Sequence, residues 1–405
     1  MTVTALLRVV LDQVVAPTSA DLSMASRELG RALVTAAPAG CAVEGIVPAV
    51  ADAAGVIEAS VPGLFDLSRT ALARRELAVA WQLGVAPGIG GGMIHSPTLM
   101  APLVKHDRVH DHDQTVVTLW DLDAWERPGE LARPAVTWHK AMLKRAVRFA
   151  DAVVVPTHAL AVRVAELGAF GDRVRVIAGA APAGFAVPTD EVGRRRALDL
   201  PEGFVLVAGS SAPSARLEDA LRAASHSGAD LPVVVIDAPE GDEPAIADLA
   251  AAAGFGEGRV HVRGALEDAD RAAVLGGAVA FLAPAVSSAF PWRVVEALAV
   301  GVPVVAADSP VHREVVWDGG VYAEVAASGA GAGAGAATGD SAAGDDGSAG
   351  GDGGAAAGES LAAALADVLR SSEAVERHAV LAGDRGRAFS WAGAAERVWQ
   401  LHADL

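Results

Sequence analysis

Hydrophobic and polar positions alternate along this chain between two patterns in a regular order. Short apolar runs, such as residues 204–209 and 279–282, are typical of buried parallel strands. Segments with apolar residues three and four positions apart, such as residues 138–149, are typical of amphipathic helices. Strands that alternate with helices over the whole length predict an α/β protein built on parallel sheets.

The predicted elements fall into two halves. Strands are expected at 6–12, 42–47, 93–97, 115–121, 150–156 and 174–177, then at 204–209, 232–237, 260–264, 279–282, 303–307 and 321–325. Helices are expected at 26–34, 58–84 with a break near Pro62, 138–149, 217–224, 246–253, 267–275, 294–299, 361–369, 374–386 and from 391 to 405. About six strands per half predict two Rossmann-like, doubly wound domains.

Proline-rich and low-complexity stretches predict the domain boundaries. We expect an N-terminal domain at 1–182, a linker at 183–201 and a C-terminal domain at 202–325. Residues 326–360 are dominated by Ala, Gly, Ser and Asp, and we expect them to form a disordered insertion because they offer little apolar surface to bury. Closing helices are expected at 361–405.

Composition narrows the functional classes. The chain has 405 residues, a formal net charge of −18 and a pI of about 5.0, which argues against nucleic acid as the main partner. Charged residues or prolines interrupt every apolar run, so no membrane span or signal peptide is expected. Cys41 is the single cysteine, which fits a reducing compartment and predicts a cytoplasmic protein.

One stretch, residues 276–316, carries the candidate chemistry. It is predicted to form a strand, a loop, a helix, a second strand and a loop after residue 307, with Ser287 and Ser288 as candidate N-caps and Pro291 at a first-turn position. The free amides and dipole of such a helix start favour an anion such as a nucleotide diphosphate. Glu296 would lie one or two turns further, within reach of a sugar hydroxyl. The alternative is an ordinary crossover helix with a solvated glutamate.

Other candidate motifs favour plainer interpretations. The sequence HDRVHDHD at 106–113 contains histidines four apart, but it is polar on all sides and precedes a strand, so we expect a solvated loop rather than a metal site. The glycines at 88–92 do not follow a strand and open a helix, which favours a connector over a phosphate loop. Lys140, Lys144 and Arg148 form a stripe that suits an anionic acceptor, a membrane surface or a solvated face.

The 276–316 stretch resembles the nucleotide-sugar site of retaining glycosyltransferases with the GT-B fold, glycosyltransferase family 4 (group 1). That family typically shows P-S-x-x-E-G-F-G-L-P-x-x-E-A-x-A-x-G-x-P-V followed by a later glutamate. The matching positions are Pro284, Phe290, Glu296, Ala297, Ala299, Gly301, Pro303, Val304, Val305 and Glu314. The chain thus resembles a divergent member, with two Rossmann-like domains facing across a cleft and a last helix that returns to the first domain.

Several cleft positions depart from the family pattern. Ser288 replaces the first glutamate of the pair, and Ala289, Pro291 and Arg293 replace two glycines and a proline. The typical T-x-H-D segment has Trp120 in place of its histidine, although Asp121 matches. The family's first loop is glycine-rich, whereas QVVAPTSADLSM contains no glycine.

The resemblance also assigns roles. The family's arginine and lysine that clamp the donor diphosphate lie six positions apart; they correspond to Ser210, directly after Gly209, and to Arg216. The implied donor-binding residues are Gly209, Ser210, Arg216, Phe290, Glu296 and Glu314, and the implied catalytic positions are Asp121, Trp120 and Ser288. The implied reaction moves a sugar from a nucleotide-sugar to a hydroxyl of a glycan or lipid-linked acceptor, with retention, in cell envelope glycan synthesis. No cofactor or metal is implied.

Two alternatives remain open at this point. The chain departs from the family at four cleft sites: the first loop, Trp120, Ser210 and Ser288. These replacements suit a weak or inactive homologue that acts as a binding or scaffold subunit. A sugar-nucleotide epimerase with a related fold is the third hypothesis, and it would need its own acid–base groups at the cleft. A packed aromatic at a strand end is the plain alternative for Trp120, and a solvated residue at a helix start is the plain alternative for Arg216.

Overall fold

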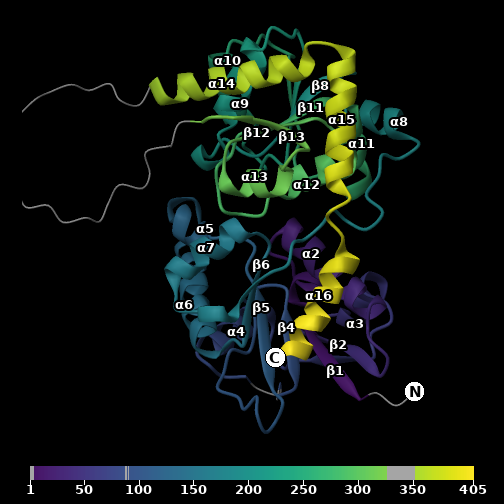
Figure 1. Cartoon of the computed structure of the whole chain (residues 1–405), viewed down its shortest axis with the longest axis vertical. Helices are drawn as coiled ribbons and strands as arrows, with labels where there is room; N and C mark the ends of the chain where they lie inside the picture. The colour runs from purple at the N-terminus through teal and green to yellow at the C-terminus, as the bar shows by residue number, and fades with distance from the viewer. Residues whose placement is uncertain (1–3, 87–88, 90, 326–351) are drawn as a thin grey trace, which may run out of the picture. The chain divides into compact units, whose positions relative to one another are not determined.

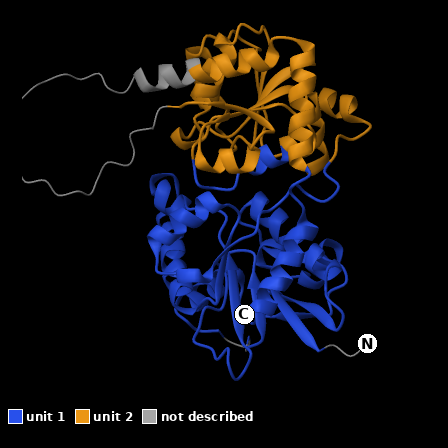
Figure 2. Ribbon diagram, in the orientation of Figure 1, with its two compact units in different colours: residues 1–185, 287–296, 387–405 blue, residues 186–286, 297–386 orange. Residues whose placement is uncertain are grey.

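The computed structural model describes residues 4–86, 89, 91–325 and 352–405, and for 352–359 it describes the backbone only. The chain forms two compact units (Figure 2). Unit 1 consists of Met1–Phe185, Ser287–Glu296 and Arg387–Leu405, and unit 2 consists of Ala186–Val286 and Ala297–Gly386. The short segment Ser287–Glu296 therefore belongs to unit 1, although unit 2 precedes and follows it in sequence.

Unit 1 is built on a parallel sheet whose strands alternate with helices. Its seven described strands lie in the order β3-β2-β1-β4-β5-β6-β7. The strands are β1 (Ala5–Val10), β2 (Cys41–Val47), β3 (Asp66–Arg69), β4 (Met93–Ser96), β5 (Gln114–Thr118), β6 (Ala152–Val155) and β7 (Val174–Val176). The helices are α1 (Asp12–Val15), α2 (Ala20–Thr35), α3 (Ala53–Ser60), α4 (Arg74–Gln82), α5 (Asp123–Glu126), α6 (Arg133–Phe149), α7 (His158–Leu167) and α16 (Trp391–Asp404).

The order of these strands divides the helices of unit 1 between two faces. From β1 the chain first adds β2 and β3 on one side of the sheet, and then β4 to β7 on the other side. Because the crossovers are right-handed, α2 and α3 lie on one face and α4, α6 and α7 on the other (Figure 1). Helix α16 packs on the α2 face, where Trp399 Nε1 donates to Leu33 O over 3.1 Å. On the other face, buried side chains of α6 and α7, such as Met142 and Leu160, pack against the strands.

Unit 2 repeats the same plan. Its six described strands are all parallel in the order β10-β9-β8-β11-β12-β13. They are β8 (Phe204–Ala208), β9 (Val233–Ile236), β10 (Val260–Val262), β11 (Ala278–Ala283), β12 (Val304–Ala307) and β13 (Gly320–Ala323). The helices are α8 (Glu191–Ala197), α9 (Leu217–His226), α10 (Glu243–Ala252), α11 (Asp268–Gly277), α13 (Pro310–Val316), α14 (Asp352–Leu369) and α15 (Ser372–Gly386). Helix α12 (Trp292–Ala299) begins in the Ser287–Glu296 segment and ends in unit 2.

Four local predictions differ from the structure. The predicted helix at 58–84 contains the strand β3, whose sequence DLSR is polar because β3 is an edge strand with little buried surface. The linker predicted at 183–201 contains α8, and the loop after 307 contains α13. Most of the predicted insertion, 326–360, lies outside the described residues, but its last part, 352–360, is the start of α14. The three consecutive alanines at 355–357 favour helix there, whereas the low hydrophobic content of the whole stretch predicted disorder.

No described helix is long and apolar enough to cross a membrane.

Candidate functional site

Trp120 follows β5 at the carboxyl edge of the unit 1 sheet, and its indole is packed rather than open. The residue is 5% exposed, and Trp120 Nε1 donates to Pro97 O over 2.8 Å. Its ring lies 4.8 Å from that of Trp292 and 5.8 Å from that of Phe290, measured between centroids. Trp120 is therefore a packed aromatic at a strand end, which is the alternative to a catalytic position given above for this residue.

Four rings form one buried aromatic cluster in unit 1: Trp120, Phe290, Trp292 and Trp391. The cluster joins the end of β5 to the Ser287–Glu296 segment and to α16. A backbone bond reinforces it, because Phe290 N donates to Trp120 O over 2.9 Å. The cluster therefore fixes the backbone immediately before α12, and Phe290, a predicted donor-binding residue, contributes its ring to this packing.

Asp121 lies next to Trp120 and is half-buried. Its Oδ1 accepts from the backbone N of Asp123 over 3.1 Å. Burial raises the pKa of the Asp121 carboxyl, and the nearby negative charge of Asp123 raises it further. A carboxyl with a raised pKa exchanges its proton closer to neutral pH, so Asp121 is suited to acid–base work.

Ser288 does not serve as a free anion-binding position in this structure. Its backbone N donates to Glu126 Oε2 over 3.1 Å, so a carboxylate already occupies the amide where a donor phosphate was expected. The Ser288 hydroxyl is buried, and no described residue forms a hydrogen bond with it. It is therefore not the N-cap that the sequence suggested, and two of the loop's amides, those of Ser288 and Phe290, are satisfied within the protein.

Glu296 is completely buried and ion-paired. Arg293 Nη1 lies 2.9 Å from Glu296 Oε1, and Arg293 Nη2 lies 2.7 Å from Asp21 Oδ1 in the first turn of α2. Arg293 thus holds one carboxylate with each terminal nitrogen. A ribose hydroxyl that binds Glu296 must share or replace this ion pair.

Unit 2 contributes the loop after β8. Gly209 has φ +145°, and a Cβ at this position would lie 3.2 Å from the Cβ of Ala215, so glycine suits this close turn. Ser210 Oγ accepts from Ala212 N over 3.3 Å, while Ser211 N donates to Asp242 Oδ2 over 2.7 Å. As at Ser288, a backbone amide of a predicted phosphate-binding loop, here that of Ser211, donates to a carboxylate of the protein.

Arg216 is the N-cap residue directly before α9 and has a left-handed conformation, with φ 52°. Its Nε donates to Asp219 Oδ2 over 2.7 Å, and its side chain is 7% exposed. The residue is therefore not the solvated helix-start residue of the plain alternative. A left-handed non-glycine residue costs free energy, which makes this loop a constrained position of the backbone.

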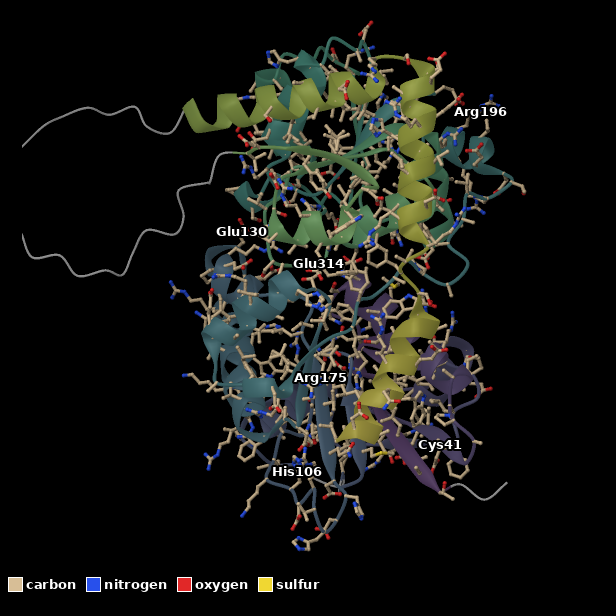
Figure 3. The ribbon with its side chains drawn as sticks, viewed as in Figure 1. Cys41, His106, Glu130, Arg175, Arg196 and Glu314 are labelled. Atoms are coloured by element: carbon tan, nitrogen blue, oxygen red, sulfur yellow. The ribbon has the colours of Figure 1, made fainter. Side chains whose placement is uncertain are left out.

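Glu314 lies on α13, at the carboxyl edge of the unit 2 sheet, and is half-buried (Figure 3). Helix α13 begins after Ser309, whose hydroxyl accepts from His312 N over 3.1 Å. Arg385 Nη2 donates to the backbone O of Glu314 over 2.7 Å and thereby holds the helix in place. Gly209, Ser210, Arg216 and Glu314 thus all follow strands of one parallel sheet, at the same edge.

Sequence reasoning missed the partners of these residues. Asp21, Glu126 and Asp219 bind predicted site residues, yet no motif marks them. Arg293 carried a signal, because it stands at the family's proline position. The structure places Trp120, Asp121, Ser288, Phe290 and Glu296 in unit 1 and the other predicted donor residues in unit 2.

The loop after β1, which lacks glycine, is closed by its own side chains. Gln13 is buried, and its Oε1 accepts from Thr18 N over 2.9 Å. Asp12 is buried as well, and its Oδ2 accepts from Arg74 Nε over 2.8 Å. Burial raises the pKa of the Asp12 carboxyl, and Arg74 opposes this effect. Side-chain contacts thus occupy the space where a glycine-rich loop would leave the backbone open.

The HDRVHDHD segment is a loop, as expected, and lies at the opposite edge of the unit 1 sheet. It lines an open cavity of about 850 Å³ together with residues that precede β4 and β5. His106 Nε2 lies 2.8 Å from Asp151 Oδ2, and this contact raises the pKa of the His106 imidazole. Within the described residues, no group of three or more His, Cys, Asp or Glu side chains could hold a metal ion.

Comparisons with known proteins agree with the two-unit fold. Residues 190–329 match the family model described as glycosyl transferases group 1. A sucrose-phosphate synthase from Thermosynechococcus elongatus has a TM-score of 0.66 at 16% identity, over 99% of this chain and 98% of its own. Anabaena HepE, solved in complex with UDP and glucose, has a TM-score of 0.67 at 15% identity, over 99% of this chain and 100% of its own.

WaaG, a glycosyltransferase involved in lipopolysaccharide biosynthesis, has a TM-score of 0.60 at 14% identity, over 97% of this chain and 98% of its own. No curated protein sequence matches the chain. Similarity at such low identity describes the fold, and the family match describes the segment from α8 to the end of β13. The fold predicted from the resemblance is thereby confirmed: the chain has the GT-B fold over its length, and residues 190–329 match the model of glycosyl transferases group 1.

Proposed function

We propose that this protein is a glycosyltransferase that moves a sugar from a nucleotide-sugar donor to a hydroxyl of a glycan or lipid-linked acceptor, with retention. The observation that carries the proposal is the group 1 match over 190–329, which includes the six described strands of the unit 2 sheet. Ligands of doubly wound sheets bind at the carboxyl ends of their strands. The loop after β8 and helix α13 lie at that edge and would hold the donor.

The proposed chemistry asks the protein to hold the leaving diphosphate and to position the acceptor. Arg216 would bind the diphosphate, Glu296 the ribose, and Glu314 the donor sugar. Asp121 would act at the acceptor hydroxyl, since its raised pKa suits proton exchange. We propose that no metal takes part. The proposed compartment is the cytoplasm, where the single cysteine, Cys41, would stay reduced.

Calorimetric titration with UDP, GDP and ADP and their sugar conjugates tests the donor site. UDP is the first probe because HepE, which shares the fold, was solved with UDP and with UDP-glucose. We expect one nucleotide to bind, and Glu296→Gln, which keeps the volume of the side chain, to weaken binding at least tenfold. Glu376→Gln, on the exposed surface of α15, is the matched control. Absence of binding to every nucleotide would exclude a donor site.

A second function is favoured by one specific observation. The amide of Ser288, the carboxylate of Glu296 and the guanidinium of Arg216 all bind partners within the protein. Groups already satisfied in this way suit a catalytically weak homologue that acts as a binding or scaffold subunit. Nucleotide binding without release of sugar, or co-purification with an active transferase, would support this function. Free interconversion of a sugar-nucleotide would instead support the epimerase hypothesis.

A further inference from the structure

Helix α6 has a charge pattern unlike that of the chain as a whole. Its sequence, RPAVTWHKAMLKRAVRF, contains five Lys and Arg residues and no Asp or Glu, in a protein with net charge −18. Three of these cations, Lys140, Lys144 and Arg148, follow one another at intervals of four residues. They therefore share one stripe along the helix, away from the buried Met142 and Ala146.

The charges of this stripe are not compensated. Within the described part of the chain, Lys140, Lys144 and Arg148 form no ion pair, whereas many arginines elsewhere are paired with carboxylates. Arg145, on the neighbouring face of α6, instead donates to the backbone O of Leu103. Lys144 and Arg148 are exposed and Lys140 is half-buried. The three side chains are thus available to an anionic partner.

Exposed aliphatic side chains lie on the adjacent helix. Helix α4 packs beside α6 on the same face of the sheet, and Trp138 Nε1 donates to Ala78 O over 3.2 Å (Figure 1). On α4 and directly after it, Leu83 is 72% exposed, Val85 55% and Val79 53%. We call Val79, Leu83, Val85, Lys140, Lys144 and Arg148 the α4–α6 surface.

The charged residues of α4 do not cancel the stripe. The exposed acidic residue of this helix is Glu76, and the exposed Arg75 precedes it. Arg74 points to the buried Asp12 instead of the surface. The six residues of the α4–α6 surface thus combine three cationic with three aliphatic side chains, a combination found where proteins lie on membrane interfaces.

We infer that the α4–α6 surface docks on the anionic phospholipid surface of a bilayer. Cationic side chains near such a surface strengthen binding about fivefold each, and the aliphatic side chains enter the headgroup region. A bilayer fits better than a globular partner because exposed aliphatic side chains on and directly after α4 lie on the helix beside the cationic stripe of α6. The remaining surface of an acidic protein is repelled by anionic lipid, so docking through this surface fixes one orientation. The inference goes beyond glycosyl transfer, since it needs neither donor nor turnover.

Co-sedimentation of the full chain with extruded vesicles tests this inference. We expect binding to vesicles of phosphatidylcholine mixed with phosphatidylglycerol, little binding to phosphatidylcholine alone, and loss of binding when salt rises from about 50 to about 500 mM. The triple variant Lys140→Gln, Lys144→Gln, Arg148→Gln should bind the anionic vesicles about a hundredfold more weakly. Leu83→Ser should weaken binding at about 50 mM salt and leave the salt dependence of binding unchanged, because the contribution of this side chain is not electrostatic.

A matched triple variant, Arg69→Gln, Arg196→Gln, Arg377→Gln, removes the same charge from exposed positions elsewhere (Figure 3 shows Arg196). It should bind as the unchanged protein does. Equal loss in both triple variants, binding that salt does not affect, or absence of binding to anionic vesicles would each overturn the inference. The substituted side chains are exposed, except Lys140, which is half-buried, so the variants should fold, and circular dichroism checks this.

Discussion

Arg293 and Glu296 lie one turn apart on α12 and form an ion pair, with Arg293 Nη1 2.9 Å from Glu296 Oε1. The glutamate belongs to the pattern of the family, and the arginine is the departure from it. Arg293, which departs from the family pattern, therefore forms the ion pair with Glu296, which matches it. Asp21 binds the same guanidinium, so a carboxylate of α2 balances the added cation.

Removal of the arginine should destabilise unit 1. Arg293→Met leaves the buried Glu296 without its cation, which typically costs about 3 kcal/mol. We expect the thermal midpoint to fall by several degrees. The double variant Arg293→Met, Glu296→Gln removes both charges and should recover most of the loss. A midpoint that does not change in Arg293→Met would mean that the ion pair contributes little to stability.

Restoring a cation after β8 should strengthen donor binding. Ser210 stands at the position of the family's arginine, and Ser210→Arg adds a guanidinium that can bind a diphosphate with two hydrogen bonds. We expect UDP affinity to rise about tenfold, since hydrogen bonds to charged groups contribute about 1.5–3 kcal/mol. Ser372→Arg, at an exposed position of α15, is the control for added charge. Unchanged affinity in Ser210→Arg would place the diphosphate elsewhere.

The ionisation of Asp121 should determine the pH at which turnover is lost on acidification. Its pKa is raised by burial and by Asp123, so the acid limb of the pH–rate profile should lie above the ordinary range of an aspartate. Asp121→Asn should lower turnover at least a hundredfold and leave UDP affinity unchanged. Asp123→Asn removes the neighbouring negative charge, so it should move the acid limb to lower pH. An acid limb that stays in place would show that Asp121 does not govern the reaction.

A buried histidine pair should make unit 1 sensitive to acid. His402 Nε2 lies 3.4 Å from His95 Nδ1, and His402 Nδ1 lies 2.9 Å from Gln114 Oε1. Burial lowers the pKa of His95 well below its ordinary 6.5 and lowers that of His402 to about 4. The nearby carboxylate of Asp151 opposes the shift at His402.

The direction of the effect follows from these shifts. The unfolded chain binds protons below a pH of about 6.5, while the folded pair stays neutral, so stability should fall as pH drops from about 6.5 toward 4. The loss should reach about 2 kcal/mol near pH 5.5. Thermal midpoints across this range measure it, and His402→Gln should reduce the slope. The same slope in the variant would assign the acid sensitivity to other groups.

Strands and long helices could be predicted because burial on both faces leaves an apolar run that is visible in sequence. The run at 204–209 thus became β8, and the 138–149 pattern became the later part of α6. Strand β3 could not be found in this way, because an edge strand buries little and DLSR has no apolar alternation. Helix α13 is short, and its start depends on the cap by Ser309.

The candidate site was predictable only as a set of positions. The family pattern located Glu296, Ser288 and Arg216, but their bonding partners come from distant parts of the sequence. Asp21 and Arg293 are 272 residues apart, and Glu126 and Ser288 are 162 apart. No local pattern contains such pairs, because they depend on how the sheet brings its loops to one edge.

The division of unit 1 into three chain segments has a consequence for its synthesis. Its sheet is complete once β7 has been made, yet α16, which covers α2 and buries His95, is the last element of the unit. During translation the face formed by α2 and β4 must therefore stay uncovered until all of unit 2 has left the ribosome. We therefore expect nascent chains to expose apolar surface in that interval, the condition under which chaperones bind unfinished proteins.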